Sequence, residues 1–371
     1  MIRILHSISY MSRGGIETML MNYYRHMDRD KIQFDFLCHS YNKGAYDEEI
    51  ERLGGRIYRT PGLNPLKIAK YLKYMKNLFA THPNYRILES HNGPFGVYSL
   101  YAAKKYNIPI RIYHAHGASL ALDLKFPLKF FCKSMLKFYM NRHFVCSKKA
   151  GYYYMGKDIM EKGKYRFIPN AIEVERFIFD STKREKVRNQ YNLNDKVVIG
   201  HVGRFSYQKN HEFLLNIFAK ACKINPNLIL ALLGSGELMG EVKKQAKKLN
   251  ICDKIIYVGN VSNTNEWYQA FDLFLLPSRW EGLPVVGIEA QAADLPCIFS
   301  TAVTDEVALS QKATFIDLKE SDDVWAGKIN EIINRKESRN NNYNLLTEKN
   351  YNIKTEAKKL QDLYISMYNE L

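Results

Sequence analysis

The sequence lacks the features that define several classes of protein. No apolar run approaches the roughly 20 residues that a membrane-spanning helix needs, and the longest candidates, such as 228–233, have the length of a strand. The six cysteines, at positions 38, 132, 146, 222, 252 and 297, form no CxxC pair. Neither a zinc site nor a disulfide framework is therefore expected, and a reducing cytoplasm is the favoured location. The first ten residues hold one arginine and no small-residue cleavage site, which argues against a secretory signal.

What is present is a globular composition over 371 residues, of which 46% are hydrophobic and 25% charged. Such values exclude long disorder and fibrous folds, and the length suits two domains better than one core. Strand-like and helical patterns alternate along the whole chain, which predicts α/β architecture with mostly parallel sheets. The Pro- and Asn-containing stretch at 167–174, FIPNAIEV, marks the join. We expect two Rossmann-like domains, 1–170 and 171–352, facing an interdomain cleft.

The excess of positive over negative charge is confined to the first domain. Residues 1–170 hold 28 basic and 12 acidic side chains, whereas residues 171–371 hold 26 of each. This imbalance favours an anionic partner for the first domain, such as a membrane surface, a nucleic acid or a phosphorylated ligand. A lysine-rich but merely solvated surface is the alternative.

Two segments of the first domain combine lysines with apolar and aromatic residues. In 64–80, apolar residues share one helical face and four lysines lie opposite, a pattern that favours a helix packed on a sheet over one lying in a bilayer. In 125–142, a lysine stripe (Lys129, Lys133 and Lys137) accompanies a wider apolar arc. There the two interpretations are about equally supported.

Glycines mark the first strand-to-helix turn. Gly14 and Gly15 lie between an apolar strand-like run and the helical 17–27, where backbone can approach a phosphate or sugar. The dinucleotide fingerprint GxGxxG is absent, and an ordinary tight turn explains the pair equally well.

Two further segments, in the second domain, carry more chemistry. Gly203-Arg204 follows a buried strand, with Lys209 just before a helix, and two cations at a strand end suit a diphosphate. In LPSRWEGLPVVGIEAQAADLP, 276–296, Glu281 precedes a helix and Glu289 lies within it. A helix N-terminus there favours phosphate, while the carboxylates suit sugar or ribose hydroxyls. The only DxD motif, 28–30, falls in a polar turn and is expected to be solvated rather than metal-binding.

In these motifs the chain resembles the retaining glycosyltransferases of family 4, which have the GT-B fold, and especially capsular and exopolysaccharide members. The matching elements run through almost the whole chain: GGIE at Gly14, Gly15 and Glu17; ESHNG with His91; RIYHAHG with His114 and His116; GRFSYQKN with Arg204 and Lys209; IPNAIEVERF; and E-x7-E at Glu281 and Glu289.

The resemblance implies transfer of a hexose or N-acetylhexosamine from a nucleotide-sugar with retained configuration, and the expected donor is a UDP-sugar. It assigns catalysis to His116, Glu281, Arg204 and Lys209. It assigns donor binding also to Gly15, Asn260, Val261, Gly282, Leu283, Pro284, Val285 and Glu289. It assigns acceptor binding or other roles to Gly14, Glu17, His91 and His114. His114 is the alternative to His116 as the residue beside the donor sugar. No covalent nucleophile is assigned.

The resemblance also implies a setting. No cofactor and no metal are expected, because Arg204 and Lys209 supply the positive charge. The expected acceptor is a glycan linked to polyprenyl diphosphate, and the expected location is the cytoplasmic face of the plasma membrane, held peripherally by the basic first domain. A final helix, 353–371, is expected to pack back on that domain. Asp294, where relatives often have Gly, is expected to be structural.

Two other kinds of protein share some of these features. A GT-B epimerase or phosphorylase has the same fold, although the GGIE loop together with E-x7-E argues against both. A basic, non-catalytic protein that binds membranes or nucleic acid would explain the charge, but no nucleic-acid motif is present and the carboxylate and cation pairs are intact.

Overall fold

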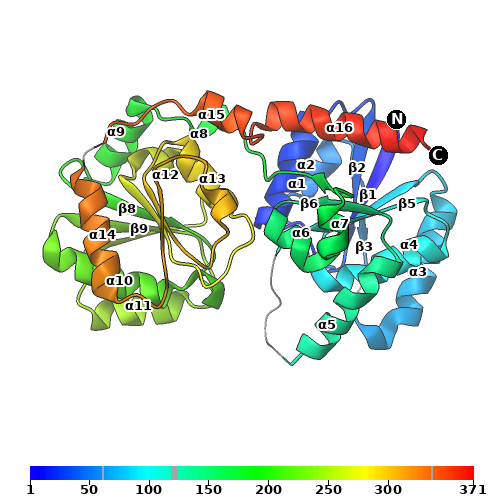
Figure 1. Ribbon diagram of the computed structural model, residues 1–371, viewed down its shortest axis with the longest axis horizontal. Coiled ribbons are helices and arrows are strands. Elements are labelled where there is room, and N and C mark those ends of the chain that lie inside the picture. The colour runs from blue at the N-terminus through cyan, green and yellow to red at the C-terminus, as the bar shows by residue number, and fades with distance from the viewer. Residues whose placement is uncertain (61, 118–123, 336) are drawn as a thin grey trace. The chain divides into compact units, whose positions relative to one another are not determined.

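The chain forms two compact units, seen in the computed structural model, which describes residues 1–60, 62–117, 124–335 and 337–371 (Figure 1). Unit 1 comprises Met1–Ala171 and Ile353–Leu371, and unit 2 comprises Ile172–Asn352. Within the described residues, no helix combines the length and the apolar character needed to cross a membrane.

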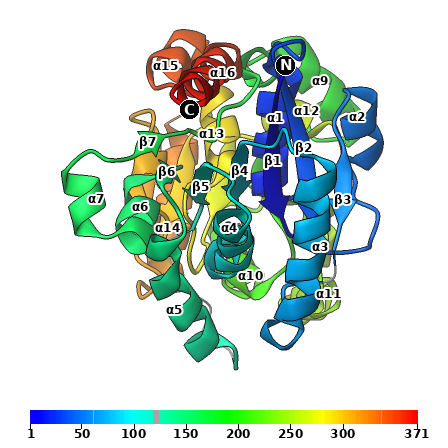
Figure 2. The same cartoon turned by 90° about the vertical axis from the view of Figure 1, so that its right-hand side faces the viewer.

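Unit 1 is built on a seven-stranded sheet in which every pair of neighbours is parallel. Its strands are β1 (Ile2–Ile8), β2 (Ile32–Cys38), β3 (Ile57–Arg59), β4 (Ile87–Ser90), β5 (Ile110–Ala115), β6 (Arg142–Val145) and β7 (Arg166–Phe167). Its α-helices are α1 (Gly15–His26), α2 (Asp47–Arg52), α3 (Ile68–Thr81), α4 (Gly96–Lys105), α5 (Phe126–Met135), α6 (Lys148–Met155), α7 (Lys157–Glu161) and α16 (Ile353–Asn369). The strand order is β3-β2-β1-β4-β5-β6-β7, which can be followed across Figure 2. The order reverses between β1 and β4, where the carboxyl ends of open α/β sheets bind ligands.

The helix α16 belongs to unit 1 although it ends the chain. It lies against α1 and places Ile353, Ala357, Leu360, Tyr364 and Met367 in the same apolar core as β1 and β2 (Figure 1). Apolar residues recur at three- and four-residue intervals in this helix, so one face is buried and the other is solvated.

Unit 2 repeats the same winding on a six-stranded parallel sheet. Its strands are β8 (Val197–Val202), β9 (Leu228–Leu233), β10 (Ile255–Gly259), β11 (Leu273–Leu276), β12 (Cys297–Ser300) and β13 (Ala313–Ile316). Its α-helices are α8 (Val174–Phe177), α9 (Ser181–Gln190), α10 (His211–Ile224), α11 (Met239–Lys248), α12 (Thr264–Ala270), α13 (Val285–Ala292), α14 (Asp322–Asn334) and α15 (Tyr343–Glu348). The order β10-β9-β8-β11-β12-β13 reverses between β8 and β11.

The structure corrects one of the predicted helices. The aromatic and basic segment 125–142 is not continuous: α5 ends at Met135, a 3-10 turn covers Leu136–Phe138, and Arg142 already begins β6. The side chain of Asn141 accepts a hydrogen bond from the backbone N–H of Arg111, at 2.8 Å, where the chain re-enters the sheet. Sheet pairing therefore takes precedence over the helical pattern at the end of this segment.

Candidate functional site

In unit 2, an ion pair joins the loops that follow the two central strands. The Lys209 ammonium lies 2.7 Å from Oε1 of Glu281, and the side chains are only 14% and 10% exposed. Lys209 ends the 3-10 turn Tyr207–Lys209, after β8, and Glu281 follows β11. Since β8 and β11 are neighbours, their carboxyl ends bring together residues 72 positions apart in the sequence.

Two further donors fix the Glu281 carboxylate. Ser278 Oγ donates to Oε1 at 3.0 Å, and Gln208 Nε2 donates to Oε2 at 3.1 Å. With the ammonium, three groups from two loops hold this carboxylate, so its position is fixed before any ligand arrives. Ser278 and Gln208 were not singled out from the sequence, although each lies within three residues of a predicted site residue.

Arg204 lies on the same loop as Lys209 but in a different setting. Its guanidinium is bonded to Glu237, with Nη2 3.1 Å from Oε2, and its side chain is 74% exposed. The loop is tight, because a Cβ on Gly203 would lie 2.9 Å from Lys209 Cε and one on Gly234 would lie 2.1 Å from the Gly203 carbonyl oxygen. The Lys209 ammonium is therefore held in a fixed position, whereas the Arg204 guanidinium is solvated and can turn toward an anion.

Glu289 is only partly exposed, and its carboxyl group accepts a hydrogen bond from a buried phenol. The hydroxyl of Tyr268, itself fully buried, donates to Oε2 at 2.8 Å. Burial raises the pKa of Glu289 from its usual 4.5 to about 7, although the Tyr268 hydrogen bond and the charge of Arg176 oppose the rise. The carboxyl therefore changes charge near neutral pH. Tyr268 is a further residue that the sequence alone did not reveal.

The remaining predicted residues of unit 2 surround the same strand ends. Pro284 occupies the N-cap position of α13, and the helix begins at Val285. No side chain caps this helix N-terminus, which follows Gly282 and the buried Leu283. After β10, the loop turns at Gly259, whose φ is +78°, and Asn260 Nδ2 donates to Ser235 Oγ at 2.7 Å beside Val261.

In unit 1, the two glycines of the turn between β1 and α1 have different surroundings: Gly14 is covered by a side chain and Gly15 is open. Gly14 is the N-cap of α1, without a side-chain cap, and the Glu17 carboxyl folds over it, since a Cβ on Gly14 would lie 2.3 Å from Oε2. Ser12 Oγ donates to Glu17 at 3.2 Å, and burial raises the pKa of Glu17. A Cβ on Gly15 would meet nothing within 4 Å. The open approach to the start of α1 is thus at Gly15.

The three predicted histidines lie together at the ends of β4 and β5. His91 Nδ1 and His116 Nε2 are 2.9 Å apart, and the rings of His114 and His116 stack with centroids 4.1 Å apart. His91 is 4% exposed and His114 only 1%, whereas His116 is partly exposed. Of the two alternatives left open by the sequence, His116 is therefore the one with surface for a ligand. His91 and His114 have almost none, which argues against a direct contact between either and an acceptor.

Among the described residues, groups of three His, Cys, Asp or Glu side chains close enough to share a metal ion are found only in this part of unit 1. Ligand atoms lie within 4.8 Å of one another in two groups, His91 with His114 and His116, and His6 with Glu89 and His91. Direct hydrogen bonds join members of both groups. The DxD motif is a solvated turn, as expected: Asp28 and Asp30 are exposed, and Asp28 pairs with Lys31 at 3.1 Å.

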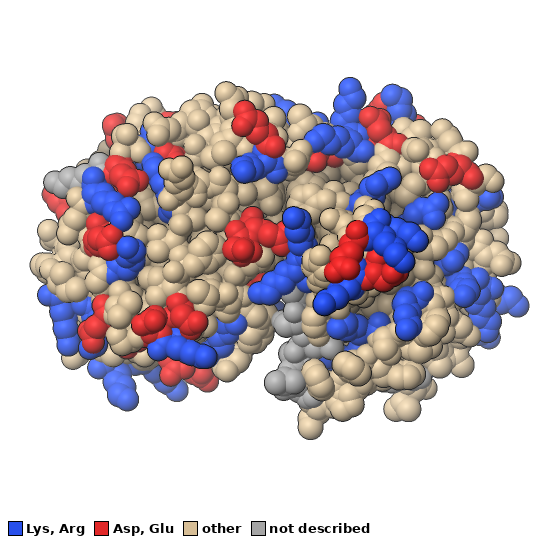
Figure 3. All heavy atoms as spheres, in the orientation of Figure 1, with Lys and Arg blue, Asp and Glu red and all other residues tan. Residues whose placement is uncertain are grey.

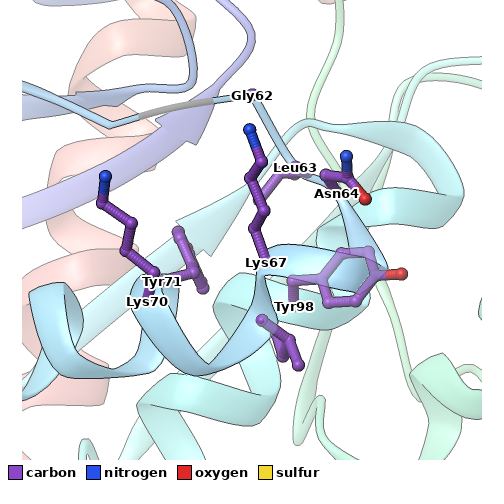
Figure 4. Close-up of a pocket in the computed structure, with 8 residues that line it drawn as sticks. Gly62, Leu63, Asn64, Lys67, Lys70, Tyr71 and Tyr98 are labelled. Atoms are coloured by element: carbon purple, nitrogen blue, oxygen red, sulfur yellow. The ribbon is translucent and has the colours of Figure 1, made fainter.

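A small pocket of unit 1 contains none of the predicted site residues. It is open to solvent and lies at the start of α3, where Lys67 and Lys70 extend to the same side (Figure 4). Its lining consists of Gly62, Leu63, Asn64, Lys67, Ile68, Lys70, Tyr71 and Tyr98.

Comparison with known families matches each half of the chain separately. The profile described as Glycosyltransferase Family 4 matches residues 13–176, and the profile described as Glycosyl transferases group 1 matches residues 183–344. Together the two matches include every predicted site residue.

Individual proteins match over most of their length. A putative glycosyltransferase of Bacillus subtilis, EpsF, is 33% identical over 88% of this chain and 86% of its own. An Escherichia coli protein named as UDP-Gal:alpha-D-GlcNAc-diphosphoundecaprenol alpha-1,3-galactosyltransferase is 26% identical over 99% of this chain and 97% of its own. The solved structure of Anabaena HepE, in complex with UDP-glucose, superimposes with a TM-score of 0.80 at 17% identity, covering 99% of this chain and 100% of HepE.

Proposed function

This chain belongs to glycosyltransferase family 4, and we propose that it transfers a hexose or N-acetylhexosamine from a UDP-sugar to a glycan linked to polyprenyl diphosphate. The transfer retains the anomeric configuration and serves the synthesis of a capsular or other cell-surface polysaccharide. The observation that carries the proposal is the Lys209–Glu281 ion pair at the central strand ends of unit 2, with Arg204 on the same loop. The two parallel-sheet units are those of the GT-B fold.

In the proposed reaction, the departing nucleotide diphosphate needs positive charge that is already in place. Lys209 provides it from a fixed position, and Arg204 adds a mobile guanidinium whose planar fork suits phosphate oxygens. The uncapped N-terminus of α13 adds backbone N–H groups. Preorganised charge of this kind stabilises a leaving group without a metal ion, and we propose that none is required.

The carboxylates bind hydroxyl groups in this scheme. Glu289 accepts from the ribose, and Glu281, with Gly282 to Val285, holds the sugar and the phosphates. Asn260 and Val261 line the base pocket. From unit 1, Gly15 approaches the diphosphate and His116 contacts the sugar near the reacting carbon. No residue is assigned as a covalent nucleophile, and the leaving phosphate acts as the base that deprotonates the acceptor.

A membrane surface is the proposed location of the acceptor. The exposed side of α5 carries Phe130 and Phe131, which are 59% and 60% exposed, and the 3-10 turn after it carries Phe138, which is 53% exposed. In Figure 3 the end of unit 1 that carries α5 is mostly tan, with Lys and Arg side chains next to it. Aromatic rings beside ammonium groups suit the interface of an anionic bilayer. We therefore propose peripheral attachment to the inner face of the plasma membrane.

The experiment that tests the proposed donor is calorimetric titration with UDP, GDP and ADP in the presence of EDTA. Binding of UDP alone supports a metal-independent site for UDP-sugars. Binding of GDP in its place keeps the mechanism but rejects the proposed donor. If none of the three binds, the assigned cation and carboxylate site is wrong. Release of UDP from a UDP-sugar only when an acceptor is added distinguishes a transferase from an epimerase.

A further inference from the structure

Unit 1 contains a buried polar cluster that the proposed reaction leaves almost unused. His6 lies on β1, Glu89 on β4 and His114 on β5, while His91 and His116 follow β4 and β5. All but His116 are buried, with exposures between 0% and 4%. Only His116 is given a ligand above, so the role of the other four residues is open.

The Glu89 carboxyl group is hydrogen-bonded to two of the surrounding side chains. His114 Nδ1 lies 2.8 Å from Oε1, and the Tyr364 hydroxyl of α16 donates to Oε2 at 2.5 Å. Burial raises the pKa of Glu89, and the Tyr364 hydrogen bond opposes that rise. Tyr364 therefore favours the ionised form of Glu89, although 275 residues separate the two in the sequence.

Three imidazoles form a hydrogen-bonded chain beside that carboxylate. His6 Nδ1 lies 3.1 Å from His91 Nε2, and His91 Nδ1 lies 2.9 Å from His116 Nε2. Burial lowers the pKa of all three histidines, so each ring is neutral at pH 7 and carries one N–H. Because each contact needs one donor and one acceptor, the chain has only two arrangements: every N–H points toward His6, or every N–H points toward His116.

Glu89 distinguishes the two arrangements. Its Oε1 lies 3.5 Å from His91 Nε2, the nitrogen that faces His6. Because the Tyr364 hydroxyl donates to Oε2 and His114 Nδ1 lies within hydrogen-bond distance of Oε1, this carboxyl group is surrounded by donors as a carboxylate is. A carboxylate attracts an N–H at 3.5 Å and repels a lone pair. His91 therefore carries its proton on Nε2, and His91 Nδ1 accepts from His116. The proton of His6 then lies on Nε2, a buried atom for which the described residues supply no hydrogen-bond partner.

We propose that Glu89 and Tyr364 are positioning residues that fix His116 as its Nε2–H tautomer, leaving Nδ1 as a hydrogen-bond acceptor. A sugar hydroxyl is the donor that such an acceptor recognises. The identity of this ligand depends on the proposed function, whereas the tautomer of the free protein does not. The helix α16 thereby acts on His116 through Tyr364, Glu89 and His91.

The tautomer is measured directly by long-range ¹H–¹⁵N correlation spectra of the free protein labelled at histidine. The His116 signals are identified with a His116→Gln variant. We expect Nε2–H in the wild type and Nδ1–H in Glu89→Gln, because the amide N–H groups of glutamine donate where the carboxylate accepted. A wild-type Nδ1–H tautomer, or a His116 signal unchanged in Glu89→Gln, overturns the proposal.

The contribution of Tyr364 is measured by acid titration of the same signals. The titratable groups around Glu89 are His6 of β1, His91 after β4, His114 of β5, and Tyr364 of α16 with Tyr23 of α1 beside it. We expect Tyr364→Phe to raise the pH at which His116 changes tautomer by at least half a pH unit. Tyr24→Phe is the matched control, because Tyr24 is equally buried in unit 1 but donates to Gln33. Equal shifts in both variants, or none in Tyr364→Phe, overturn the role of Tyr364.

Transfer assays separate this inference from the proposed function. We expect Glu89→Gln to raise the KM for the donor at least tenfold, while the binding of UDP, which lacks the sugar, changes less than twofold. An unchanged donor KM in an active enzyme overturns the link between the tautomer and the sugar. If the wild type transfers no sugar at all, the proposed function fails and the spectra still decide the tautomer.

Discussion

At the scale of single residues, the two glutamates of the E-x7-E motif occupy contrasting environments. The Glu281 carboxylate accepts hydrogen bonds from an ammonium, an amide and a hydroxyl group, and these donors on two loops fix its position. Glu289 accepts a hydrogen bond from the Tyr268 hydroxyl, and burial moves its pKa to about 7. Carboxylates only eight positions apart thus differ in what they can do: one is held against a cation, and the other is poised to change protonation near neutral pH.

The ion pair of Lys209 is expected to matter for turnover. We expect Lys209→Met to lower kcat/KM by roughly 100-fold or more, the range found when one preorganised charge or donor is lost. Lys220→Met in the same unit is the control, since Lys220 pairs with Asp323 on the surface, at 40% and 71% exposure. Exposed pairs contribute little, so the control keeps wild-type kcat/KM. A Lys209→Met enzyme within threefold of wild type contradicts the assignment.

Glu289 makes the stability of unit 2 depend on pH. Between about pH 4.5 and pH 7, the unfolded chain releases this proton while the folded chain keeps it. Stability therefore falls as pH rises through this window and is constant above it. Relative to wild type, Glu289→Gln is expected to gain free energy of unfolding across the window, by roughly 3 kcal/mol at most.

Chemical denaturation at pH 5, 6, 7 and 8 tests this expectation. All three tryptophans, Trp267, Trp280 and Trp325, belong to unit 2, so their fluorescence follows the relevant unit. Glu320→Gln, at an exposed position of the same unit, is the control. A difference between Glu289→Gln and wild type that stays constant from pH 5 to pH 8 rules out the raised pKa.

At the scale of elements, five helices end in the same way. An Asn or Asp with positive φ follows α4, α9, α11, α13 and α15, at Asn107, Asn192, Asn250, Asp294 and Asn350. This left-handed position usually takes Gly, and Asn or Asp adopts it at modest cost. Asp294 is therefore structural, as the sequence indicated, and its buried carboxylate also accepts from Lys312 at 2.7 Å.

The helix α5 shows which side chains test a membrane contact. Of the three lysines in its predicted stripe, Lys133 lies 3.5 Å from the centroid of the Tyr153 ring, and Lys137 lies over Phe138. Replacing Lys133 would therefore disturb packing within unit 1 as well as surface charge. The exposed rings of Phe130 and Phe131 are the cleaner targets, because little of unit 1 rests on them.

Replacement of both rings is expected to weaken membrane binding without loss of stability. Transfer of a phenylalanine side chain out of water contributes about 1.5–3 kcal/mol when complete. We therefore expect Phe130→Ser/Phe131→Ser to lower partitioning onto anionic vesicles about tenfold or more, measured by sedimentation. Ile224→Ser, at a 60% exposed position of unit 2, is the control. Equal binding by the double variant and wild type excludes α5 as the attachment surface.

At the scale of the whole molecule, sequence patterns predicted the features that depend on residues close together in the chain. Alternating strands and helices, the motif positions and the returning final helix follow from periodicity and resemblance, and the GT-B fold is confirmed. The sequence patterns did not predict which side chains distant in the chain become partners. Tyr364 and Glu89 meet only because α16 returns to unit 1 and packs against α1, and Tyr268 reaches Glu289 only through the packing of α12 against α13. No local pattern encodes such pairs.

Because α16 packs in unit 1, we expect a change in the last 19 residues to affect the stability of unit 1 and not that of unit 2. Ala357 is fully buried in the core of unit 1, and an aspartate there would place an unpaired carboxylate among apolar side chains, at a cost of several kcal/mol. We expect Ala357→Asp to speed hydrogen exchange in peptides from residues 1–171, because they share that core. Peptides from 172–352 should keep wild-type protection, although they immediately precede α16 in the chain. Lys358→Asp, one residue along on the exposed side of the helix, should leave both sets unchanged. Loss of protection in both units with Ala357→Asp would mean that the two units unfold together, and that α16 stabilises more of the molecule than the core it enters.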